Sequence, residues 1–194
     1  MKENNFFAML ARMKYIDRWG LMRNTINENI AEHSLDVAVI AHGLATISNL
    51  YFDGTVDAER VAVIAMFHDV TEIITGDMPT PIKYFAPEIM KAYKDIEANA
   101  ANQLVKGLPQ QMQDVYRGIL LPEDDEKDLY RFVKAADKIS AYIKCIEEKR
   151  MGNTDFLEAE KATLEAVRSM HMKEADYFLD NFMAAYSLTL DEQA

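Results

Sequence analysis

Two adjacent side chains in the middle of the sequence are of the kinds that bind metal ions. His68 and Asp69 lie in MFHDVTEIITGDMPTP, residues 66–81, whose first part has the apolar spacing of a buried helix. Ala65, His68 and Glu72 follow one another at spacings of three and four, which place them on one stripe of a helix. Burial of such polar groups requires a compensating partner. An isolated His-Asp pair is more often a core histidine beside a solvated aspartate, so the pair needs support from elsewhere in the chain.

Two further residues supply that support. His33 lies in IAEHSLDVAVIAH and Asp137 in RFVKAADKISAY, both within stretches of helical spacing. Asp137 follows two alanines that let a neighbouring helix approach, and a carboxylate buried there is costly unless a cation accompanies it. Imidazole nitrogens and carboxylate oxygens suit a divalent ion, and side chains from several helices can converge in a bundle core. The candidate ligands of one divalent cation are therefore His33, His68, Asp69 and Asp137.

The elements that position these residues are predicted to be helices. Asn29 stands three residues before Glu32 as in a capping box, Asp57 is a suitable N-cap, and Gly76 is a suitable helix end. The predicted helices cover about residues 5–16, 30–50, 58–75, 87–107, 124–151, 154–170 and 172–186, with a short segment after Pro109. The run DMPTPIKYF, residues 77–85, is predicted to be a loop stiffened by proline. We expect one all-α domain over residues 1–194, with about six to eight helices.

Composition and charge exclude several classes of protein. The chain has 194 residues, 49% of them hydrophobic, which is enough to bury the core of one domain. The lone Cys145 cannot form an internal disulfide, and MKENNFFAMLARMK lacks the apolar run of a signal peptide, so we expect a cytoplasmic location. No apolar run approaches the roughly 18 to 20 residues that span a bilayer. A formal net charge of −11 disfavours a nucleic-acid polymer as partner and requires local basic residues for any small anionic substrate.

Three stretches resemble a known family. RWGLMRNTINENIAEHS, HDVTEIITGDMPTPIKYF and KAADKISAYIKCIEE are similar to the corresponding parts of the bacterial HD-domain 5'-deoxynucleotidases, which belong to the HD-domain metal-dependent phosphohydrolases. The similarity extends over nearly the whole chain. It implies a helical HD-domain fold that is likewise one domain, and a homodimer. It also implies hydrolysis of deoxyribonucleoside 5'-monophosphates to deoxyribonucleosides and inorganic phosphate, in nucleotide metabolism.

The resemblance also implies how the metal site works. One divalent cation, such as cobalt or manganese, is expected to be held by His33, His68, Asp69 and Asp137. Of these residues, His33, Asp69 and Asp137 are expected to lie against the substrate as well. A bound divalent cation can act as a Lewis acid and can lower the pKa of water from about 15.7 to roughly 7. Such chemistry needs no serine or cysteine nucleophile. The identity of the native metal stays open, because mixed nitrogen and oxygen ligands admit several ions.

Three residues are expected to act on the phosphate and the sugar. Glu72, one turn beyond His68, is the candidate proton donor to the departing 5' oxygen. Arg18 is the candidate phosphate ligand, because a planar guanidinium can bind two phosphate oxygens at once. In the family, Trp19 occupies the place of a wall beside the sugar, where a rigid indole excludes a ribose 2'-hydroxyl. A preference for deoxyribose therefore follows from the resemblance alone.

The loop after Gly76 is expected to complete the substrate site. Asp77 can accept a hydrogen bond from the sugar 3'-hydroxyl and is also a catalytic candidate, since the division of roles between Glu72 and Asp77 stays open. Met78, Pro79 and Thr80 can line the nucleoside side of the pocket. Few hydrogen bonds to a base are expected here, so we predict broad tolerance among bases.

Other interpretations remain open at this point. The same site can serve a cyclic nucleotide, a nucleoside triphosphate or a guanosine polyphosphate, although HDVTEI lacks the His-Asp-x-x-Glu-Asp run associated with guanosine polyphosphate hydrolases. A non-catalytic, metal-stabilised nucleotide-sensing module is a third possibility, and the presence of Arg18, Glu72 and Asp77 argues against it. His42 lies nine residues beyond His33, about two and a half helical turns, and so points to the opposite side of that helix. His42 and His171 are both expected to be structural.

Overall fold

Helices make up the architecture of this chain. The computed structural model describes residues 4–83, 85–121 and 126–194, and these ranges contain no β-strand, only an isolated antiparallel bridge between Asp17 and Asn29. The elements in chain order are α1 (Phe6–Leu10), η1 (Ala11–Tyr15), α2 (Ile30–Tyr51), α3 (Ala58–Met66), α4 (Glu72–Thr75), α5 (Thr80–Lys83), α6 (Pro87–Val105), α7 (Gln110–Leu120), α8 (Lys127–Arg150), η3 (Thr154–Phe156), α9 (Leu157–Arg168), α10 (Lys173–Phe182), η4 (Met183–Ser187) and α11 (Leu190–Gln193), where η denotes a 3₁₀-helix. The prediction of an all-α fold is confirmed. The described part has more helices than the predicted six to eight, because several elements are single turns.

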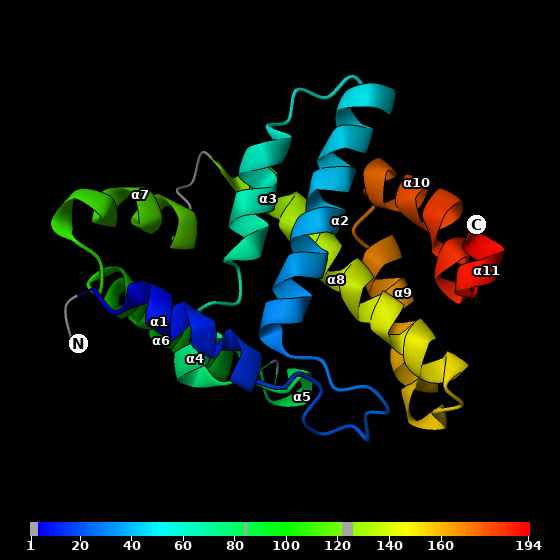
Figure 1. The fold of residues 1–194 in the computed structure, drawn as a ribbon, viewed down its shortest axis with the longest axis horizontal. Coiled ribbons are helices and arrows are strands. Elements are labelled where there is room, and N and C mark those ends of the chain that lie inside the picture. The colour runs from blue at the N-terminus through cyan, green and yellow to red at the C-terminus, as the bar shows by residue number, and fades with distance from the viewer. Residues whose placement is uncertain (1–3, 84, 122–125) are drawn as a thin grey trace.

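Helix α2 is the centre of the structure. The predicted capping box is present: Asn29 accepts hydrogen bonds from the backbone N–H groups of Ala31 and Glu32, and the Glu32 side chain accepts one from the Asn29 N–H. Helix α2 packs against α3 on one face and α8 on another, and α10 covers its far end. Figure 1 shows α9, α10 and α11 on one side of α2, and α1, α4, α6 and α7 gathered beyond α3 on the other.

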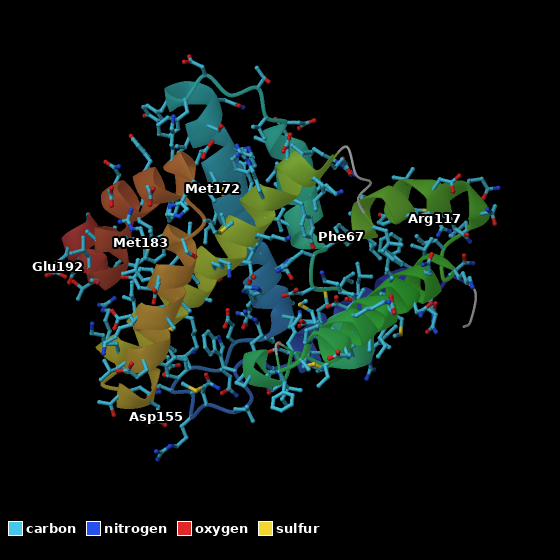
Figure 2. The ribbon with its side chains drawn as sticks, turned by 180° about the vertical axis from the view of Figure 1, so that it is seen from behind. Phe67, Arg117, Asp155, Met172, Met183 and Glu192 are labelled. Carbon is cyan, nitrogen blue, oxygen red and sulfur yellow. The ribbon has the colours of Figure 1, made fainter. Side chains whose placement is uncertain are left out.

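Two apolar clusters hold these helices together. The larger one is formed mainly by α2, α3, α8 and α10, and includes the fully buried Leu44, Val61 and Ile139. The smaller one joins the N-terminal segment to α6 and contains Phe6, Leu104 and other residues, with Phe67 packed against it. Figure 2 shows Phe67 where α3 ends, between the two groups of helices. The segment that follows Phe67 therefore lies at the junction of the two clusters.

The prediction of one helix over residues 58–75 is wrong. Helix α3 ends at Met66, and α4 begins only at Glu72. Between them the backbone forms tight turns, in which an N–H group donates to the carbonyl three residues earlier, as in a 3₁₀-helix. The His68 N–H donates to the Ala65 carbonyl (3.3 Å), and the Glu72 N–H donates to the Asp69 carbonyl (2.9 Å). The same Ala65 carbonyl accepts a hydrogen bond from His68 Nδ1 at 2.7 Å. This local pairing replaces the regular α-helical bond and turns His68 and Asp69 out of the helix.

Other predicted boundaries differ less. Residues 80–83 form the single turn α5 inside the predicted loop, since Pro81 suits the first turn of a helix. The 3₁₀-helix η1 follows α1 within the predicted helix 5–16, and η3 and η4 flank α9 and α10 within the two C-terminal ones. The predicted start of the long helix at Asp124 lies outside the described residues. Within the described ranges, no helix combines the length and the apolar character required to cross a membrane.

Candidate functional site

Three of the predicted metal ligands converge at one point. His33 lies in the first turns of α2, while His68 and Asp69 lie in the turn between α3 and α4. One ligand atom from each of the three residues lies within 4.8 Å of the others. The His33 side chain is completely buried, and 8% of His68 and 22% of Asp69 are exposed. The break in the predicted helix 58–75 is therefore what directs two side chains at the third.

The hydrogen bonds around the two imidazoles orient them toward the carboxylates. The Ala65 carbonyl can only accept, so His68 Nδ1 carries a proton and Nε2 has the lone pair in the neutral ring. Behind His33, the Ser140 hydroxyl lies 3.2 Å and Glu28 Oε1 lies 3.6 Å from Nδ1. Such outer contacts are typical of metal-ligating histidines, because they orient the ring and leave Nε2 for the metal.

In the centre of the site, the Nε2 atoms of both imidazoles face the carboxylate of Asp69. His68 Nε2 lies 3.1 Å from Asp69 Oδ2, and His33 Nε2 lies 3.4 Å from the same oxygen. Neither Nε2 makes a hydrogen bond with any part of the chain that the structure describes. Burial acts to lower the pKa of His33, but the neighbouring carboxylates outweigh it and raise that pKa to about 10. The cluster therefore favours positive charge, and its nitrogen and oxygen donors fit a divalent cation.

Asp137, the fourth predicted ligand, lies on the solvent side of this cluster. It lies on α8, and its Oδ1 is 3.2 Å from His33 Nε2. Its side chain is 42% exposed, in contrast to the buried His33. The Asp137 carboxylate is also close to a positive charge, since Arg18 Nη2 lies 3.8 Å from Asp137 Oδ1. The site thus opens toward solvent on the side of Asp137 and Arg18.

Arg18 is held at this opening by a residue that we did not predict from the sequence. Its Nη1 donates to both carboxylate oxygens of Glu28, at 3.1 and 3.0 Å. Burial acts to lower the pKa of Arg18, but Glu28, Asp137 and Asp69 outweigh it and raise that pKa. Arg18 is therefore a charged group inside a largely acidic site. Glu28 lies within the motif RWGLMRNTINENIAEHS, yet spacing along an irregular loop carries no periodicity that would have identified it.

Trp19 lies beside Arg18 in an unusual backbone conformation. Its φ of +59° is uncommon for a bulky residue and indicates local strain. The indole Nε1–H donates to Glu28 Oε2 at 3.0 Å, and the ring packs against Phe156 with a centroid distance of 5.3 Å. The surrounding contacts therefore hold the indole in one orientation next to the candidate phosphate ligand.

Glu72 is the predicted proton donor, and it is buried at the start of α4. Its Oε2 has no hydrogen-bond partner among the described residues. Burial raises the pKa of Glu72 to about 9, and the charges of Asp69 and Asp77 add to the increase. A carboxyl in this state is protonated at neutral pH, which is the form that a general acid requires.

The predicted sugar-facing loop lies on the same side of the molecule as Arg18. Asp77 is partly buried, and burial raises its pKa. Arg18 and an interaction with the backbone N–H of Trp19 act in the opposite direction but do not outweigh burial. Met78 and Pro79 are half-buried and follow Gly76, whose φ of +71° ends α4. Thr80 begins α5, and its side chain lies outside the described part of the structure.

Two histidines stand apart from this cluster. His42 and His171 are both exposed, on α2 and before α10 respectively. A cavity of about 580 Å³ lies at the far end of α2, and its lining includes His171, Arg131 and Glu174. The predicted site residues do not occur among the described residues that line this cavity.

Two solved HD-domain phosphohydrolases have the same fold as this chain. One is an HD-domain phosphohydrolase from Listeria innocua, 22% identical, with a TM-score of 0.81 over 97% of this chain and 91% of the other. A second is the HD phosphohydrolase DatZ of cyanophage S-2L, bound to dA and one catalytic Zn²⁺ ion, which is 19% identical with a TM-score of 0.65 over 97% of this chain and 99% of the other. The fold is therefore that of the HD-domain phosphohydrolases.

Sequence comparison defines the family more closely. The model of the YfbR-like 5'-deoxynucleotidases matches residues 5–186. A 5'-deoxynucleotidase of Vibrio cholerae is 50% identical over 99% of this chain and 99% of its own length. The 5'-deoxynucleotidase YfbR of Escherichia coli is 49% identical over 99% of this chain and 96% of its own. The chain belongs to the YfbR-like 5'-deoxynucleotidase family, as the resemblance predicted.

Proposed function

We propose that this chain hydrolyses deoxyribonucleoside 5'-monophosphates to deoxyribonucleosides and inorganic phosphate with the help of one divalent cation. The observation that carries the proposal is the convergence of His33, His68 and Asp69 beside a largely buried arginine and a buried glutamate. Membership of a family of 5'-deoxynucleotidases supports the substrate class. These residues supply what hydrolysis of a phosphate monoester requires: a cation site, a phosphate ligand and a proton donor.

His33, His68, Asp69 and Asp137 are the proposed ligands of the cation. A divalent cation, when bound, supplies Lewis-acid chemistry: it polarises a phosphoryl oxygen and lowers the pKa of water. The hydrogen bonds at the back of the two imidazoles, between His68 and the Ala65 carbonyl and between His33 and Ser140, orient the rings, and Glu28 lies 3.6 Å from His33 Nδ1 as a nearby charge. The proposed contact of His33, Asp69 and Asp137 with the substrate follows from their place around the same point.

Arg18 and Glu72 have complementary roles in this proposal. Arg18 binds the phosphate through the part of its guanidinium that faces Asp137, and its fixed charge offsets the negative charge that accumulates on the phosphoryl oxygens. Glu72 carries a proton at neutral pH and transfers it to the 5' oxygen as the ester bond breaks. Without that proton the nucleoside would have to leave as an alkoxide.

Trp19 and the segment 77–80 are the proposed sugar site. The indole is fixed from two sides, by Glu28 and by Phe156, and a rigid wall can exclude a 2'-hydroxyl. Asp77 accepts a hydrogen bond from the 3'-hydroxyl in this arrangement. Met78, Pro79 and Thr80 contact the nucleoside mainly through apolar and backbone groups, so broad base tolerance is expected.

Several finer points remain predictions. These are cobalt or manganese as the metal, a homodimer as the assembly, a cytoplasmic location, and a single domain over residues 1–194. The mixed nitrogen and oxygen donor set supports a divalent ion without selecting one.

Phosphate release from metal-free protein tests the proposal. The protein is stripped with a chelator and supplied in turn with manganese, cobalt, magnesium or zinc, and inorganic phosphate is measured with deoxyribonucleoside and ribonucleoside 5'-monophosphates. We expect release with at least one metal and a clear preference for the deoxyribonucleotide. Absence of release with every metal contradicts the proposal. Release of pyrophosphate or triphosphate from longer nucleotides, with monophosphates inert, assigns the same site to a different substrate.

A further inference from the structure

The loop of residues 17–29 is closed at its base by paired backbone groups. Asp17 and Asn29 form an antiparallel bridge, and the Arg18 N–H donates to the Glu28 carbonyl at 2.9 Å. The Ile30 N–H donates to the Ile16 carbonyl at 3.0 Å on the outer side. Glu28 therefore stands directly across the loop from Arg18, at a distance that the backbone fixes.

The Glu28 side chain contacts three residues of the candidate site at once. Its carboxylate accepts two hydrogen bonds from Arg18 Nη1 and one from Trp19 Nε1. Its Oε1 also lies 3.6 Å from His33 Nδ1. Only 12% of the side chain is exposed, so these charge-assisted contacts are shielded from water.

The contacts leave a defined part of Arg18 for a ligand. Nη1 is occupied by Glu28, whereas Nη2 points toward Asp137 at 3.8 Å, on the open side of the site. A guanidinium is planar, so fixing one of its amino groups fixes the direction of the other. The strained backbone of Trp19 indicates in the same way that the indole is held in place by its surroundings.

We propose that Glu28 is the positioning residue of the substrate site, because one carboxylate orients the phosphate ligand Arg18, the sugar wall Trp19 and the metal ligand His33. The proposal rests on the function proposed above. Glu28 itself does not touch the substrate in this arrangement. It acts by directing Arg18 Nη2 at the phosphate and by fixing the indole against the sugar, so it determines both catalytic efficiency and the preference for deoxyribose.

The chain offers a matched control for this residue. Glu126 also binds an arginine with both carboxylate oxygens, since Arg60 Nε and Nη2 donate to them at 2.6 and 2.8 Å. Its side chain is 21% exposed, similar to Glu28, but the pair joins α3 to the start of α8, away from the candidate site. Glu126→Gln therefore removes a comparable ion pair without altering the loop of residues 17–29.

The first measurement uses Trp19 as a probe and needs neither metal nor substrate. Trp19 is the only tryptophan of the chain, so the intrinsic emission at long excitation wavelengths reports on its environment alone. We expect Glu28→Gln to shift the emission maximum and to increase quenching by acrylamide, because the carboxylate contact with the indole is weakened. Glu126→Gln should leave both unchanged. Emission of Glu28→Gln identical to that of the wild type overturns the proposal, whether or not the protein proves to be a nucleotidase.

The second measurement compares steady-state kinetics of the metal-loaded proteins. Loss of one charge-assisted hydrogen bond typically lowers an equilibrium or rate constant roughly 10- to 100-fold. We therefore expect Glu28→Gln to lower kcat/KM for a deoxyribonucleoside monophosphate by that factor. We also expect the ratio of deoxyribo- to ribonucleotide activity to fall several-fold. Glu28→Asp retains the charge and should recover part of the kcat/KM and part of the preference for deoxyribose. If Glu28→Gln does not fold, Glu28→Asp is used in its place. A deoxyribose preference unchanged in every folded Glu28 variant contradicts the proposal, and an inactive wild type contradicts only the proposed function.

Discussion

Glu148 on α8 anchors the middle of the loop of residues 17–29, and its removal is expected to destabilise the protein. Its side chain is completely buried and accepts hydrogen bonds from the N–H groups of Thr25 (2.9 Å) and Ile26 (3.1 Å) and from Asn153 Nδ2 (2.7 Å). Lys144, one turn earlier, donates both to Glu148 and to the Ile26 carbonyl. Through this buried ion pair, α8 therefore supplies hydrogen-bond partners for backbone groups of Thr25 and Ile26 in the loop.

The magnitude can be worked from these contacts. Glu148→Gln retains the size of the side chain but leaves the Lys144 ammonium buried without its counter-charge, which typically costs about 3–5 kcal/mol. Burial acts to raise the pKa of Glu148, but Lys144, Asn153 and the two loop N–H groups outweigh it and lower that pKa from 4.5 to about 2. A shift of that size corresponds to roughly 3 kcal/mol, in agreement with the first figure. For a chain of this length, 3–5 kcal/mol lowers the Tm by roughly 6–20 °C.

The pH dependence gives the prediction a second signature. Because the pKa of Glu148 is lower in the folded protein, its contribution is fully present above pH 4.5 and is lost as the pH falls toward 2. The stability difference between wild type and Glu148→Gln should therefore be large at pH 7 and shrink below pH 4.5. Thermal and urea unfolding, followed by circular dichroism, measure it at each pH.

An exposed ion pair on α9 provides the control for Glu148. Lys161 and Glu158 are in contact at 2.8 Å, but their side chains are 73% and 86% exposed, so Glu158→Gln should leave the Tm nearly unchanged. A loss of less than about 1 kcal/mol for Glu148→Gln at pH 7 would refute the reasoning, because it would place the pair in the range of surface salt bridges.

Four further outcomes are expected. Asp69→Asn should lower phosphate release by roughly 10³-fold and weaken metal binding in isothermal titration calorimetry, since it removes a ligand charge; an unaltered metal affinity would contradict its assignment. Glu72→Gln should lower kcat by about 10²- to 10⁴-fold while elemental analysis finds the same metal content, and loss of the metal would instead make Glu72 a ligand. Removal of the metal with a chelator should lower the Tm, and its return at 100 times the Kd should restore about 2.7 kcal/mol; a Tm indifferent to metal would argue against binding at the cluster. Asn29→Ala should cost about 1 kcal/mol in urea unfolding, because α2 loses its N-cap, and no loss would show that the capping box contributes little.

Local signals in the sequence determined much of this protein. The capping box at Asn29, the N-cap at Asp57 and the stop at Gly76 depend on hydrogen bonds and dihedral angles within a few residues, so they could be predicted without the rest of the chain. Helical periodicity likewise placed His33 and Asp137 on helices that face the core. The family resemblance supplied the substrate class, which no periodicity contains.

Tertiary structure decided how the site is assembled. The turn that brings His68 and Asp69 together replaced a predicted continuous helix, because a side-chain bond to the Ala65 carbonyl and packing between two apolar clusters outweighed helical propensity. The partnership of Glu28 with Arg18 and Trp19 arises in an irregular loop, where side-chain direction depends on how the ends of the loop meet. Contacts of this kind depend on packing between segments far apart in the chain, and a linear pattern of residue types contains no record of it.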